Sequence, residues 1–136
     1  MFENVNELAV LVSAMLSVAI GSIWYSPLLF GKSWMRLAGL TVEDEDIPVK
    51  EASILAGKGV VIQSVFFYII AQFISLSKAG TLPLATLGVF ILILLLSYMM
   101  SVVVWERKLF SYFLIHAGYG ALAVATGIGI IAFWPW

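Results

Sequence analysis

The groups in this chain that could carry chemistry are few, and the most distinctive is its single histidine, His116. It lies in a span, residues 109–134, that contains no Asp, Glu, Lys or Arg. An imidazole inside such a span can relay protons or bind a ligand, and it can equally donate one hydrogen bond to a neighbouring helix. Its expected partners are Tyr112, Tyr119 and Glu106. Both roles stay open at this level.

A second set of polar side chains recurs every four residues in another apolar span, at Ser64, Tyr68 and Gln72. Gln63 is nine residues from Gln72, which places it on the opposite face of a helix. Polar groups in hydrocarbon must face a partner helix or a wet cavity, because an unpaired amide there is costly. We expect hydrogen bonds between helices. The alternative is a polar path, shared with His116 and its neighbouring tyrosine.

Reactive partners for these groups are missing from the sequence. The chain has no cysteine, which removes disulfides and thiolate metal sites. A lone histidine without a second ligand or a carboxylate in any span completes neither a metal site nor a catalytic triad. The net charge of −1, with no dense Lys/Arg cluster, argues against a nucleic-acid partner. We therefore expect no enzyme activity, no cofactor and no bound metal.

Composition indicates a membrane protein. Of the 136 residues, 62% are hydrophobic and 11% are charged, whereas a soluble domain has about a quarter charged residues. Uncharged spans near the ~20 residues that cross a bilayer predict four helices. We expect an all-α, antiparallel four-helix transmembrane bundle forming a single domain over residues 1–136, with one cytoplasmic interfacial loop over 26–47. The predicted helices cover about 6–25, 48–77, 82–105 and 109–134.

The segment after the first helix has the aromatic and basic side chains of a membrane boundary. Pro27 predicts the end of the helix, because proline lacks an N–H and disfavours helical geometry in the preceding residue. Residues 33–38 resemble a short interfacial helix closed by Gly39 in a left-handed cap. Five side chains are expected to fix the depth of this loop or, alternatively, to hold an anionic lipid headgroup: Trp24, Tyr25, Lys32, Trp34 and Arg36.

Further along this loop, Thr41 and Asp44 resemble a capping box, and Pro48 suits the first turn of the second helix. The acidic run at 43–46 is expected to be a solvated turn, with a divalent-cation site as the alternative.

Two ridges of small side chains recur at four-residue spacing and predict close helix packing, since such ridges let backbones approach in lipid. Both are treated as helix-packing faces: Ala9, Ser13, Ser17 and Gly21 in the first helix, and Ala117, Ala121, Ala125 and Gly129 in the last.

The distribution of basic residues predicts the orientation of the chain. Six of the seven Lys and Arg residues fall in the connections after the first and third helices or near the start of the second helix, and only Lys78 falls on the other side. The positive-inside rule therefore places those two connections in the cytoplasm and both termini outside.

Two motifs resemble those of a bacterial membrane-protein family, the domain of unknown function 1761 family. The first is Trp-Tyr-Ser-Pro-Leu-Leu-Phe-Gly-Lys-Ser-Trp at 24–34, and the second is Leu-Ile-His-Ala-Gly-Tyr at 114–119, preceded by Glu106 and followed by Gly127 and Trp134. The family more often has Asn in place of His116. The resemblance implies four transmembrane helices in the bacterial cytoplasmic (inner) membrane and no established activity.

These observations favour a non-enzymatic structural or interaction subunit. Its partners would be the lipid bilayer and, through the small-residue ridges, a second copy of itself or a larger membrane complex. The alternative is a small oligomeric transporter or channel that uses the polar stripe of the second helix together with His116.

Overall fold

The computed structural model describes residues 5–40, 49–80 and 82–135. This part of the chain is all-helical, which confirms the predicted fold class, and all its helices except the second are long and apolar enough to cross a membrane. The helices are α1 (Glu7–Trp24), α2 (Gly31–Ala38), α3 (Val49–Lys78), α4 (Leu84–Trp105) and α5 (Phe110–Phe133).

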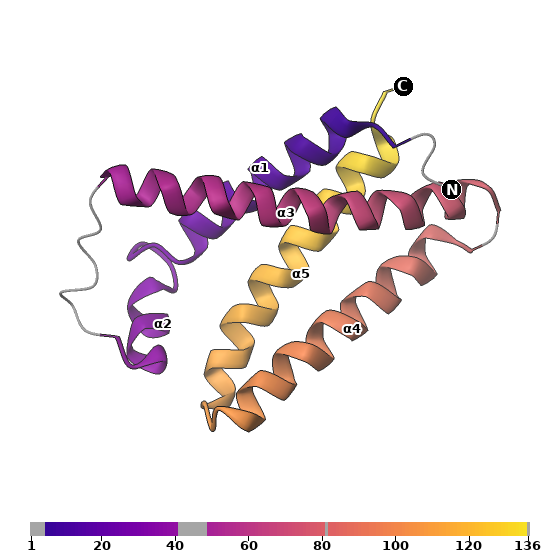
Figure 1. The fold of residues 1–136 in the computed structure, drawn as a ribbon. Coiled ribbons are helices and arrows are strands. Elements are labelled where there is room, and N and C mark those ends of the chain that lie inside the picture. Colours follow the sequence, from indigo (N-terminus) through magenta and orange to yellow (C-terminus); the bar gives the residue numbers. More distant parts are fainter. Residues whose placement is uncertain (1–4, 41–48, 81, 136) are drawn as a thin grey trace.

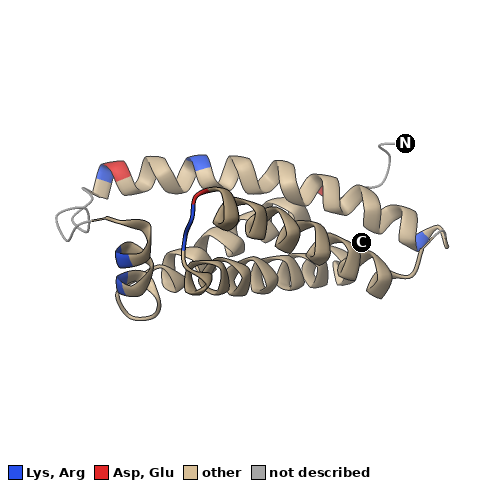
Figure 2. Ribbon diagram, turned by 90° about the horizontal axis from the view of Figure 1, so that it is seen from below, with Lys and Arg blue, Asp and Glu red and all other residues tan. Residues whose placement is uncertain are grey.

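The four long helices form a bundle with up-and-down connections (Figure 1). α4 and α5 run antiparallel beside each other, as expected for helices joined by only four residues, 106–109. α1 lies against α5, and α3 crosses both. The start of α1 and the end of α5 lie at one end of the bundle, and α2 and the α4–α5 turn lie at the other. Most of the Lys and Arg residues gather at the α2 end, whereas Lys78 lies in the last turn of α3 at the opposite end (Figure 2).

The helix limits fall within two residues of the predicted ranges. Asn6 caps α1, since its Oδ1 accepts a hydrogen bond from the backbone N–H of Ala9 at 3.0 Å. α1 ends at Trp24, before Pro27, and Gly39 closes α2 with a left-handed φ of 81°. The predicted capping box at Thr41 and Asp44, the acidic run at 43–46 and the first-turn Pro48 lie outside the described residues.

The first small-residue ridge faces the core of the bundle. Ala9, Ser13 and Ser17 are all at most 2% exposed. The Ser13 hydroxyl donates to the carbonyl of Ala9 at 2.8 Å, and it lies 3.5 Å from the carbonyl of Gly127 on α5. The small side chains of α1 thus let α5 approach closely, and no polar atom is introduced without a partner.

The second small-residue ridge lies beside the packed face of α5. Ala125 is exposed, and a Cβ built on Gly129 would meet no atom within 4 Å. The periodicity of the ridge is regular, but the bundle buries a neighbouring stripe because α1, α3 and α4 approach from that side. The buried residues of α5 are Ile115, Gly120, Ala123, Val124, Gly127 and Ile131.

Candidate functional site

The polar centre of the structure is His116, which lies near the start of α5 at the α2 end of the bundle. Its Nδ1 is 2.8 Å from the hydroxyl of Tyr25, the residue that caps α1. Its Nε2 accepts a hydrogen bond from the indole N–H of Trp34 in α2 at 3.3 Å. One imidazole therefore connects three helical elements that are far apart in the sequence.

These contacts determine the protonation of the ring. An indole N–H can only donate, so the Nε2 of His116 must carry no proton. The neutral imidazole then has its proton on Nδ1, which donates to the hydroxyl oxygen of Tyr25. Burial, followed by the neighbouring Tyr119 and Tyr112, raises the pKa of Tyr25 well above its ordinary value, so this hydroxyl stays protonated. Both ring nitrogens of His116 are thus engaged in hydrogen bonds.

A second polar junction lies one turn further along α5, at Tyr119. Its hydroxyl donates to the backbone carbonyl of Ser17 at 3.2 Å. The same oxygen accepts from the Ser17 hydroxyl at 3.2 Å and from the amide of Gln63 on α3 at 3.4 Å. A phenol has one donor and two acceptor positions, so this hydroxyl is saturated. The junction ties α1, α3 and α5 together.

Aromatic rings fill the space around these two junctions. Tyr25 lies edge-on to both Trp34 and Tyr119, with ring centroids 5.4 and 5.5 Å apart, respectively. Tyr112 contacts the imidazole of His116 at 4.4 Å between centroids. Such edge and tilted pairs add about 0.5–1.5 kcal/mol each beyond the area they bury. A small cavity of about 130 Å³ between α4 and α5 reaches this cluster at Tyr112 and His116.

The close approach of α1 to α5 depends on a glycine in the second family signature. The indole N–H of Trp24 donates to the carbonyl of Ile115 at 3.0 Å. This places the ring over Gly118, where an added Cβ would lie 2.8 Å from Cζ2 of Trp24. Phe30 packs against the same indole, with ring centroids 4.6 Å apart. Both signatures of the sequence therefore meet in one place.

The boundary residues are arranged differently from what their types suggest. Trp24, Tyr25 and Trp34 turn their polar atoms inward onto α5, because the backbone folds back after α1 and brings α2 beneath it. Only Lys32 and Arg36 of the predicted set are exposed. The polar tips of the aromatic residues thus hold the bundle together, and the two basic side chains alone face outward.

The predicted polar stripe of α3 does not reach His116. Ser64 and Tyr68 line a groove between α1 and α3 that also contains Glu7. The Nε2 of Gln72 is buried without a hydrogen-bond partner among the described residues. The glutamine that takes part in a polar junction is Gln63, which donates to the Tyr119 hydroxyl and which the helical spacing assigned to the opposite face.

Sequence reasoning therefore missed Gln63, and it missed Tyr25 and Trp34 as partners of His116. The predicted partner Tyr112 contacts the ring, whereas Glu106 is exposed at the C-terminal cap of α4. The position of Tyr25 two residues before Pro27 was the available signal. It showed that the tyrosine begins the turn toward α2.

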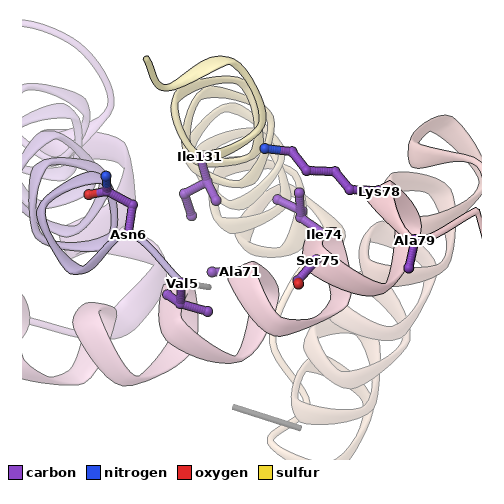
Figure 3. Close-up of a pocket in the computed structure, with 8 residues that line it drawn as sticks. All are labelled: Val5, Asn6, Ala71, Ile74, Ser75, Lys78, Ala79 and Ile131. Carbon is purple, nitrogen blue, oxygen red and sulfur yellow. The ribbon is translucent and has the colours of Figure 1, made fainter. Parts of the chain in front are cut away.

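A separate cavity of about 500 Å³ lies at the opposite end of the bundle (Figure 3). It is bounded by the start of α1 at Asn6, the last turns of α3 at Ser75 and Lys78, and Ile131 near the end of α5. The Oδ1 of Asn6 is already used to cap α1. Across the described residues, no group of three or more His, Cys, Asp or Glu side chains is arranged to hold a metal ion.

The chain has four helices that could span a bilayer, and an aromatic and histidine cluster joins helices at one end of the bundle. These features are those of a helical multi-pass membrane protein. Over residues 8–132 it matches the family described as Protein of unknown function (DUF1761). The chain belongs to this family, as its two signatures indicated. No curated protein and no solved structure matches it.

Proposed function

We propose that this protein is a non-enzymatic structural or interaction subunit of the bacterial cytoplasmic membrane, acting in a homo-oligomer or a larger membrane complex. The observation that carries the proposal is the engagement of both ring nitrogens of His116 by Tyr25 and Trp34. A ring held in this way fixes helices, and it must break a hydrogen bond before it can take up a proton or a ligand.

The use of the small-residue ridges indicates where a partner would bind. Ala9, Ser13 and Ser17 of the α1 ridge are buried within the chain and are not accessible to a second protein. The face of α5 that contains Ala125 and Gly129 is open, so a partner helix could approach it closely. This face is the proposed contact with a second copy or with a larger protein.

Disulfide crosslinking tests this contact cleanly, because the natural chain has no cysteine. Ala125→Cys in native membranes is expected to give a crosslinked dimer or a mixed disulfide with a larger protein. Val89→Cys, at a position 53% exposed on α4, is the matched control and should stay monomeric. The intact mass of the untagged complex, extracted in mild detergent, then separates a homo-oligomer from a larger assembly. A monomeric mass with no Ala125→Cys adduct would contradict the proposal.

A small oligomeric transporter or channel is the second candidate, and the unpaired amide of Gln72 favours it. A buried amide without a partner costs free energy, which a polar path or a partner chain would offset. Ion flux in liposomes that is lost in Gln72→Leu would support this candidate. Flux at the level of protein-free liposomes would leave the subunit proposal in place.

The proposed orientation has both termini outside, because most of the basic residues lie at the α2 end of the bundle (Figure 2). A C-terminal reporter that is active only in the cytoplasm should therefore stay inactive. An active cytoplasmic reporter would reverse the orientation.

A further inference from the structure

A groove of about 620 Å³ lies between α2 and the start of α5 at the basic end of the bundle, and a cationic side chain, Arg36, contributes to its lining. Its polar lining consists of Ser33 and Arg36 on α2 and Ser111 on α5. No carboxylate of the described residues lines it. Its volume lies in the range of about 300–1,000 Å³ that is usual for small-molecule sites.

The other walls of the groove are apolar and open to the outside of the bundle. Phe30, Leu37 and Leu114 contribute side chains, and Leu114 is 55% exposed. The groove is therefore amphipathic, with one positive charge and two hydroxyls beside a hydrocarbon surface. Lining of this kind complements a ligand that joins an anionic group to an alkyl chain.

Both walls of the groove are held in place by contacts outside it. Trp34 is hydrogen-bonded to His116, which fixes the middle of α2 on α5. Lys108 in the α4–α5 turn donates from Nζ to the carbonyl of Ala38 at 3.3 Å, which fixes the end of α2. A site whose walls are fixed before binding loses less conformational entropy on binding.

We propose that this groove binds one anionic phospholipid. Its phosphate accepts hydrogen bonds from the Arg36 guanidinium and from the hydroxyls of Ser33 and Ser111, and the upper part of an acyl chain lies along Phe30, Leu37 and Leu114. Arg36 suits this role because its planar fork can donate two parallel hydrogen bonds to a phosphate. The site is independent of the subunit role proposed above, since it lies on α2 and the first turns of α5, away from Ala125 and Gly129.

Lipid binding by the whole protein in nanodiscs tests the proposal, with retained lipid measured by native mass spectrometry. Phosphatidylglycerol should be retained in preference to phosphatidylcholine, at one tightly held molecule per chain. Loss of a charged hydrogen bond predicts that Arg36→Gln lowers this retention about tenfold. Lys32→Gln is the matched control, because it removes the same charge from the same helix at an exposed position outside the groove lining.

A second measurement does not depend on Arg36 and decides the question if Arg36→Gln fails to fold. In an otherwise wild-type chain, Leu37→Cys should be protected from a charged thiol reagent by phosphatidylglycerol and not by phosphatidylcholine. Lys32→Cys should react equally in both. Glycerol phosphate, which has the anionic group without the chain, should not protect Leu37→Cys.

Three results would overturn the proposal. Equal retention of the two lipids would show that the groove does not select the anion. An equal loss of lipid retention in Lys32→Gln and Arg36→Gln would show that only the general surface charge matters. If glycerol phosphate protected Leu37→Cys as strongly as the lipid does, the acyl chain would not contribute to binding in the groove.

Discussion

The assignment of separate hydrogen bonds to the two nitrogens of His116 leads to a prediction about α2. Asn at this position places its amide near the site of Nδ1, where it can still donate to Tyr25, but it is too short to reach Trp34. Gln reaches the site of Nε2, where its carbonyl can accept from Trp34. His116→Asn should therefore release α2 from α5, and His116→Gln should keep it docked.

The magnitude follows from the loss of one hydrogen bond. A net contribution of about 0.5–1.5 kcal/mol for the Trp34 bond, at 3.3 Å, corresponds to a roughly 2- to 12-fold change in the ratio of docked to released α2. Acid should have the same effect as Asn, because an imidazolium carries an N–H on both nitrogens and cannot accept from Trp34. Docking is then favoured at higher pH and weakens as the pH falls. The hydroxyl of Tyr25, which contacts the ring, stays neutral throughout this range because burial raises the pKa of Tyr25.

The labelling rate of a cysteine placed in α2 provides the assay. Met35→Cys is half-buried while α2 is docked and should react faster when it is released. Rates are compared between the wild-type residue, His116→Asn and His116→Gln from about pH 8 to about pH 5, where histidine titrates. The His116→Gln variant corrects for the pH dependence of the thiol itself. Equal rates in the two variants, or the same pH dependence of the rate with His116 and with His116→Gln, would refute the assignment.

Two further predictions concern packing and the second junction. Gly127→Ala should destabilise the bundle by about 1–3 kcal/mol, because the added Cβ would overlap the fully buried ring of Phe67. Gly129→Ala, where the added Cβ meets no atom, should be nearly neutral in the monomer. Thermal unfolding in detergent compares the two variants, and equal effects would contradict the packing of α5. Tyr119→Phe should destabilise the bundle by about 1–2 kcal/mol, since it leaves the hydroxyl of Ser17 and the amide of Gln63 without their acceptor. A melting temperature equal to that of the wild-type protein would contradict the hydrogen bonds assigned to Tyr119.

The sequence predicted the elements of this fold well. Uncharged spans, Pro27 and Gly39 located the helices and their ends, because each acts through the local backbone or through the width of a bilayer. The two family signatures also identified the segments that meet in the candidate site. These properties depend on residues that are close together in the chain, so they can be read without knowing which helices touch.

The partners of each side chain could not be predicted in the same way. His116 binds Tyr25 and Trp34 across more than 80 residues, and helical spacing placed Gln63 away from the polar stripe although it is the one that reaches Tyr119. Two equally regular small-residue ridges also differ, since that of α1 is buried and that of α5 is partly open. Periodicity shows that residues share a face of a helix, but the rotation and crossing of the helices determine which face is covered. Those are properties of the assembled bundle, in which every helix competes for the same neighbours.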